Sequence, residues 1–144
     1  MVGGPIKLQA AAGNITVNAG TAGNPGISAT GSGDVLLQTL SANGDILVNA
    51  QILSSSGDIT LNSADDVLLN AEIVPLPVPI IQTAGAGTVF IQATNGTIAD
   101  PNSGVVMTAN AVVQAAADVR VVTQNASDIR LGRINASSVS LIAN

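Results

Sequence analysis

A seven-residue phrase recurs along this chain and constrains its fold more than any other feature. Clear copies open with glycine and an aspartate or asparagine, then place β-branched, aliphatic and small residues at alternate positions. They occupy residues 13–19, 33–39, 44–50 and 57–63, and weaker copies occupy 65–71, 87–93, 117–123, 127–133 and 137–143. Alternation with a period of two after a turn predicts a short β-strand. A chain that repeats one short strand along its length is typical of a solenoid.

The spacing of the copies predicts an all-β fold, a parallel β-helix. Corresponding β-branched residues such as Ile46, Val67 and Val89 are about 20 to 22 residues apart, with further strands between them. One unit of that length therefore holds two or three strands and forms one coil. The 144 residues then make a single β-helix domain, 1–144, of about six or seven coils. We expect Ile46, Val67 and Val89 to share one interior column.

The residues that open each copy are predicted to form the corners of the coils. Glycine permits a positive φ, and an aspartate or asparagine side chain accepts hydrogen bonds from backbone N–H groups in turns. The small residue that closes each copy then lies where the coil narrows. The expected structural turns are Gly13 and Asn14, Gly33 and Asp34, Gly44 and Asp45, and Gly57 and Asp58.

The fourth position of the phrase faces outward, yet four copies carry a large apolar side chain there: Leu36, Leu47, Leu68 and Phe90. We expect Leu47, Leu68 and Phe90 to stack as one exposed apolar stripe. Exposed stripes of this kind mark contact surfaces. The stripe is a candidate contact with a second chain, unless the proline-rich segment 73–80 folds back and covers it.

The sixth position is also outward and carries amides, which can hydrogen-bond to one another along a stack. We interpret this row as stabilisation of the solenoid, with a polar strip for sugars as the alternative. The row consists of Asn18, Gln38, Asn49, Asn62, Asn70 and Gln92.

Prolines at alternate positions interrupt the repeat. Pro75, Pro77 and Pro79 remove the N–H groups along one edge of an extended segment. We expect an excursion from the coil at about 73–83, or an outer strand lying against it, and not a domain boundary.

Composition argues against catalysis. The chain has no His, Cys, Trp or Tyr, and its turn aspartates have a sufficient structural role. We expect no enzyme activity, no catalytic residues and no cofactor, and the lack of cysteine excludes zinc thiolate sites. Asp65 and Asp66 would gather oxygens with Asp45 if these residues stacked. The glycine-rich repeat of calcium-binding β-rolls is absent, however, so no metal site is expected.

Charge and hydropathy exclude two kinds of partner. The formal net charge is −5, from nine acids and four bases, which disfavours nucleic-acid binding. Arg120, Arg130 and Arg133 are interpreted as solvated positions without aromatic stacking partners. The longest apolar run, 73–81, is broken by three prolines and is too short to span a membrane.

The copies at 44–50 and 57–63, together with the run 129–136, resemble the repeats of filamentous-haemagglutinin-type exoproteins. These are large bacterial adhesins exported by two-partner secretion. The resemblance covers nearly the whole chain except 73–83. It implies a right-handed parallel β-helix within a secreted or cell-surface fibre, flanked by coils of the same or a neighbouring chain. Because the chain has no Arg-Gly-Asp triplet, the resemblance supports the shaft of a fibre more than its head.

The sequence therefore predicts a non-catalytic shaft segment of an extracellular fibre or adhesin. Two alternatives stay open. The first is a filament subunit, a homo-oligomer that stacks through open coil ends and associates as its concentration rises. The second is a carbohydrate-binding β-helix, which needs a groove of acidic and aromatic residues, although Phe90 is the sole aromatic residue here. No residue pattern identifies a receptor.

Overall fold

The computed structural model describes residues 3–19, 25–70, 79–95, 103–125 and 128–144, which form strands and no helix. The strands belong to three sheets, which we name A, B and C. Sheet A contains β1 (Ile6–Ala10), β4 (Val35–Thr39), β7 (Ile59–Ser63), β10 (Val89–Ala93), β13 (Asp118–Thr123) and β16 (Ser138–Ala143). Sheet B contains β2 (Ile15–Val17), β5 (Ile46–Val48), β8 (Val67–Leu69), β11 (Gly104–Met107) and β14 (Asp128–Arg130). Sheet C contains β3 (Ile27–Ala29), β6 (Ile52–Ser54), β9 (Ile81–Thr83), β12 (Val112–Gln114) and β15 (Arg133–Asn135).

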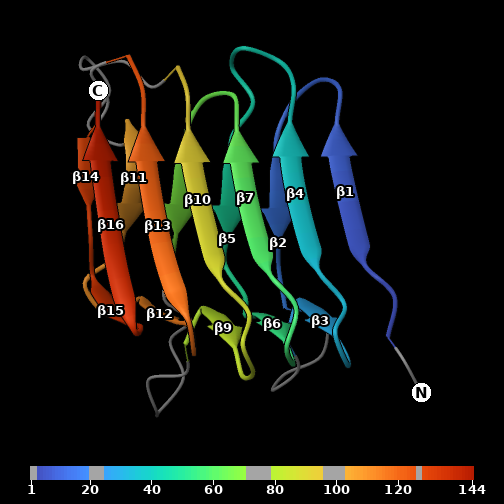
Figure 1. Cartoon of the computed structure of the whole chain (residues 1–144). Helices are drawn as coiled ribbons and strands as arrows, with labels where there is room; N and C mark the ends of the chain where they lie inside the picture. Colours follow the sequence, from blue (N-terminus) through green and yellow to red (C-terminus); the bar gives the residue numbers. More distant parts are fainter. Residues whose placement is uncertain (1–2, 20–24, 71–78, 96–102, 126–127) are drawn as a thin grey trace.

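The chain visits the three sheets in turn, so each coil has three strands, and neighbouring coils pair in parallel. In Figure 1 sheet A rises at the front, sheet B descends behind it and sheet C lies at the bottom, while the coils advance from right to left. A path with that sense is a right-handed helix. The predicted right-handed parallel β-helix is therefore confirmed. Sheet A has six strands and sheets B and C have five each, so the described strands form five complete coils and begin a sixth, slightly fewer than the six or seven predicted.

The coils are less uniform than the expected 20 to 22 residues. Hydrogen bonds between equivalent positions of successive coils join residues 29, 24, 30 and 20 apart in sequence. The sequence suggested a shorter, regular coil because the repeated phrase occurs twice in a coil. The copy at 33–39 forms β4 in sheet A, and the copy at 44–50 forms β5 in sheet B of the same coil.

This double use of the phrase makes one expected column wrong. Ile46 pairs with Val67, as predicted, but the next residue in that column is Val105. Val89 lies in sheet A, where it pairs with Ile59 and Val119. Copies that look alike in sequence thus belong to two different sheets.

Aliphatic columns fill the interior of the solenoid. In sheet A, Leu37, Leu61, Ile91 and Val121 stack on one another and are fully buried. Columns of Ile, Val and Leu from sheets B and C complete a single hydrophobic core. Full burial of such a side chain contributes about 1.5–3 kcal/mol. The core therefore stabilises the fold without large aromatic rings.

The corner glycines are required mainly for close packing and not for a positive φ. Of the four turn glycines expected from the sequence, only Gly13 has a positive φ, at 73°. Gly57 stacks on Gly33, and a Cβ atom on Gly57 would overlap the carbonyl oxygen of Gly33. At the corner before sheet B, the hydroxyl groups of Thr39 and Ser63 both donate to the carbonyl oxygen of Gly44, each at 2.7 Å. The corners at Gly33, Gly44 and Gly57 thus have no room for larger residues.

The proline-rich excursion ends earlier than expected. Residues 73–78 lie outside the described residues. Ile80 and Ile81 are buried, and Ile81–Thr83 is the ordinary sheet C strand β9. The Ile52 N–H donates to the Ile80 carbonyl, and the Gln51 side-chain amide donates to the Pro79 carbonyl. Residues 79–83 therefore belong to the coil.

Candidate functional site

Turn aspartates connect successive coils along the corner before sheet A. The Asp34 Oδ1 atom accepts the N–H of Asp58 at 2.9 Å. Asp58 Oδ1 in turn accepts the N–H of Thr88 at 2.7 Å and its hydroxyl at 3.0 Å. Each side chain therefore satisfies a backbone donor of the next coil instead of one in its own turn.

A second ladder of this kind follows the corner before sheet B. Asn14 Oδ1 accepts the N–H of Asp45 at 2.9 Å, and Asp45 Oδ1 accepts that of Asp66 at 3.3 Å. Asp66 Oδ1 accepts the N–H of Gly104 at 2.5 Å. The acceptor always belongs to the earlier coil and the donor to the later one, so the ladder has a direction. Hydrogen bonds to ionised acceptors are stronger than bonds between neutral groups.

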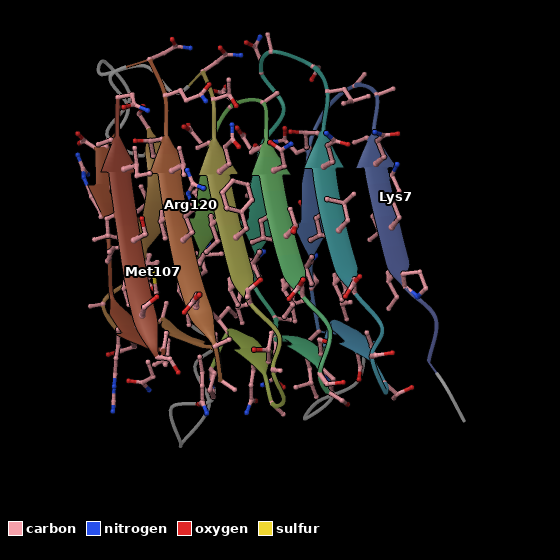
Figure 2. The ribbon with its side chains drawn as sticks, viewed as in Figure 1. Lys7, Met107 and Arg120 are labelled. Atoms are coloured by element: carbon pink, nitrogen blue, oxygen red, sulfur yellow. The ribbon has the colours of Figure 1, made fainter. Side chains whose placement is uncertain are left out.

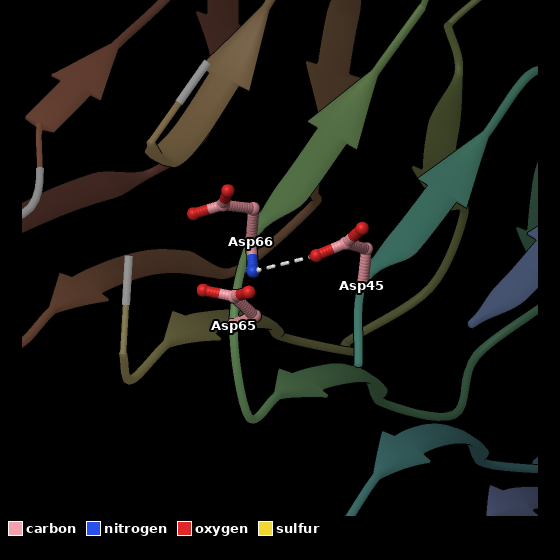
Figure 3. A group of neighbouring side chains, drawn as sticks. All are labelled: Asp45, Asp65 and Asp66. Atoms are coloured by element: carbon pink, nitrogen blue, oxygen red, sulfur yellow. Dashed lines mark hydrogen bonds between the residues drawn. The ribbon is translucent and has the colours of Figure 1, made fainter. Parts of the chain in front are cut away.

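The same corner brings three carboxylates together. One oxygen atom from each of Asp45, Asp65 and Asp66 lies within 4.8 Å of the other two. Asp66 is only 6% exposed, and the other two are half-buried. Figure 3 shows the three side chains at the starts of β5 and β8, with the Asp66 N–H donating to Asp45. From the sequence, Asp45, Asp65 and Asp66 had to stack if their oxygen atoms were to gather. The structure shows that they do.

The outward amides form two rows and not one. Asn49 donates to Asn18 at 2.9 Å, and Asn70 donates to Asn49 at 2.7 Å, just beyond the strands of sheet B. The other three amides lie in register across sheet A, where Gln38 also accepts a bond of 2.8 Å from Gln9. They are Gln38, Asn62 and Gln92. The hydrogen-bonded row on sheet B supports a structural role.

The expected apolar stripe is only partly formed. Leu47 and Leu68 are register partners on the outer face of sheet B, and Val106 follows them. Phe90 lies on sheet A, and Leu36 is separated from it there by Thr60. We call Leu47, Leu68 and Val106 the sheet B stripe, and all three are half-buried. Val106 was missed because its strand lacks the Gly-Asp opening of the phrase.

The arginines do not form a basic patch, because each belongs to a different sheet. The expected lack of an aromatic partner is wrong for Arg120, which lies on sheet A with its guanidinium carbon 5.9 Å from the centroid of the Phe90 ring. Figure 2 shows Arg120 and Lys7 on the outer face of this sheet. Arg130 lies on sheet B and forms an exposed ion pair with Asp128 at 2.9 Å, and Arg133 lies on sheet C. Exposed pairs of this kind contribute at most about 1 kcal/mol.

Comparisons with protein-family models, with curated proteins and with solved structures found no match for this chain. In the described part of the chain, no helix is long and apolar enough to cross a membrane. The functional argument therefore depends on the ladders, columns and outer faces described above.

Proposed function

We propose that this chain is a non-catalytic shaft segment of a secreted or cell-surface fibre, of the filamentous-haemagglutinin type that its repeats resemble. The observation that carries the proposal is the continuity of its bonding from coil to coil. Backbone pairing, aliphatic columns and side-chain ladders all run parallel to the solenoid axis. A solenoid bonded in this way is extended and stiff, which is what a shaft requires.

The placement of the polar groups supports a structural role over a catalytic one. The turn aspartates accept backbone N–H bonds, and the buried hydroxyls of Thr39 and Ser63 donate to a corner carbonyl. These groups are engaged in joining coils. We therefore expect no hydrolase or lyase turnover on polysaccharides. Turnover that Asp58→Asn alone abolishes would contradict the shaft proposal.

Localisation gives a direct test of the extracellular part of the proposal. Antibodies raised against the folded chain should label intact cells of the source organism or its culture medium. Brief protease treatment of intact cells should remove the cell-surface signal. Labelling that requires permeabilised cells would contradict an extracellular fibre.

The sheet B stripe is the candidate lateral contact of the shaft. The triple change Leu47→Ser, Leu68→Ser, Val106→Ser should abolish lateral association, as seen by sedimentation, and leave the melting temperature unchanged. Loss of stability in a monomer would instead assign the stripe to an internal contact. Leu40→Ser is the matched control, because Leu40 is exposed and lies outside the stripe.

A second candidate function is a filament subunit that stacks through its coil ends. The exposure of core-column side chains at both ends favours it: Leu8 is 43% exposed on β1, and Leu141 is 50% exposed on β16. Stacked coils, from this chain or a neighbouring one, would cover both side chains. Light scattering that rises with concentration and is lost in Leu8→Ser and in Leu141→Ser would support this candidate. A constant monomer mass would exclude it.

A further inference from the structure

We propose that Asp45, Asp65 and Asp66 bind one divalent cation of calcium size at the corner before sheet B, with the Ser103 hydroxyl as a further ligand. This proposal goes beyond the shaft function and does not depend on it. It is carried by two separate observations. One is the spacing of the carboxylates, and the other is the buried Ser103 hydroxyl, which lacks a hydrogen-bond partner in the described part of the chain.

The spacing of the carboxylate oxygens fits calcium. Oxygen ligands lie about 2.3–2.6 Å from Ca²⁺, so two ligands on opposite sides of the ion are about 4.6–5.2 Å apart. The three carboxylate oxygens lie within 4.8 Å of one another, so one ion can contact all of them. Mg²⁺ requires a near-ideal octahedral arrangement and keeps several of its waters, whereas Ca²⁺ accepts irregular sets of oxygen ligands, so Ca²⁺ is the better match for these protein side chains.

Ser103 is the second observation. It is only 3% exposed, and within the described residues its Oγ is the buried side-chain polar atom that lacks a hydrogen-bond partner. Val105 pairs with Val67, so Ser103 and Asp65, each two residues earlier, occupy matching positions. Ser103 therefore lies at the same corner as Asp65, one coil further along.

The backbone next to Ser103 is already attached to the cluster. The Gly104 N–H, which follows Ser103 in the chain, donates to Asp66 Oδ1. Asp45 is held similarly, because its Oδ1 accepts the Asp66 N–H and its Oδ2 accepts the Asn14 side-chain amide. A carboxylate has about four acceptor sites, so these bonds are compatible with a bound cation. They hold the carboxylates in place before the ion arrives.

The sequence at this corner also departs from the repeat. Asp65 stands where the clear copies carry the corner glycine, as at Gly33, Gly44 and Gly57. The N–H ladder uses the second residue of the phrase, so it does not need an acid at the first position. The additional carboxylate brings like charges together in a partly buried corner, and a bound cation would offset their repulsion. Asp65 is thus the residue that distinguishes this corner from a purely structural one.

Calorimetric titration of the whole chain with Ca²⁺, after treatment with a chelator, tests the proposal. We expect one ion per chain and an increase in melting temperature of several degrees at saturation. Asp65→Asn should weaken Ca²⁺ binding about tenfold or more, because affinity follows the charge of the ligands. Asp45→Asn should weaken it similarly. Asp58→Asn is the matched control, since Asp58 has the same ladder role before sheet A, and it should leave binding unchanged.

Ser103→Ala gives a readout that a purely structural serine would not produce. It should weaken Ca²⁺ binding several-fold while raising the melting temperature of the calcium-free protein, because a buried hydroxyl without a partner is removed. Circular dichroism confirms that each variant is folded. Absence of heat and of any melting shift in the unmodified chain up to about 10 mM Ca²⁺, beyond the range of weak extracellular sites, would overturn the proposal. Equal binding by Asp65→Asn and the unmodified chain would also overturn it.

Discussion

Leu61→Ala removes a side chain from the middle of the core. Leu61 lies on β7, stacked between Leu37 of the preceding coil and Ile91 of the following one, and all three are fully buried. Leu8 lies at the end of the same column, has one stacked neighbour, and is 43% exposed. The two positions thus differ in burial and neighbours while sharing chemistry and strand position. Leu8→Ala is therefore the matched control.

The expected loss in the free energy of unfolding depends on how far the surrounding structure can close around each shortened side chain. The strands on both sides of Leu61 are held by backbone ladders, so the cavity left by Leu61→Ala cannot collapse. We expect a loss of about 3–5 kcal/mol in the free energy of unfolding. Leu8 is partly exposed to water in the folded protein, so its burial contributes less free energy. Its removal also leaves no closed cavity. Its replacement should cost about 1–2 kcal/mol.

Far-UV circular dichroism and scanning calorimetry are suitable assays, because the chain has no Trp or Tyr to report by fluorescence. For a chain of this size, 1 kcal/mol corresponds to about 2–4 °C in melting temperature. Leu61→Ala should therefore lower the melting temperature by about 6–20 °C, and Leu8→Ala by about 2–8 °C. Equal effects of the two changes would refute the continuous column. A negligible effect at Leu61 would show that β7 is shifted by one residue, since such a shift exchanges the two faces of a strand.

Two further substitutions test the corners and the outer ladder. Gly57→Ala should destabilise by about 1–3 kcal/mol in chemical denaturation, because its Cβ atom would overlap the backbone of Gly33. Asn49→Ala should cost about twice as much as Asn18→Ala, because Asn49 makes two bonds of the amide ladder and Asn18 makes one, each worth about 0.5–1.5 kcal/mol. Equal costs for the two asparagine changes would show that the ladder adds nothing to stability.

The fold could be predicted from the sequence because the solenoid pattern is local. Alternation within each copy determines which side chains face inward, and that pattern holds in β4, β7 and β10. What the sequence did not show is which copies share a sheet. The copies that form sheets A and B have the same opening and the same alternation, so Val89 looked equivalent to Ile46. Only the path of the chain between copies separates them, and the variable length of that path hides the true period.

The candidate sites were harder to predict, because they depend on pairing between coils. Phe90 and Leu68 occupy the same position in their copies, yet they face outward from different sheets. Val106 and Ser103 carry no motif at all, since their strand opens with Ser-Gly instead of Gly-Asp. The acidic pair at Asp65 could be recognised in sequence. Its position beside Asp45 required the register, which the structure supplies.

The repeat explains how a site can arise on a scaffold that otherwise only connects coils. The ladder needs an acceptor at the second position of the phrase and uses no side chain at the first. The first position is therefore the one at which a change adds chemistry without breaking the ladder. At β8 that position is Asp65, and in the next coil it is Ser103, so two substitutions of the corner residue place two oxygen ligands beside acids that the ladder already holds. Asp65→Gly, which restores the glycine of the clear copies, should consequently keep the fold and lose the cation, and this separates the structural role of the corner from its chemistry.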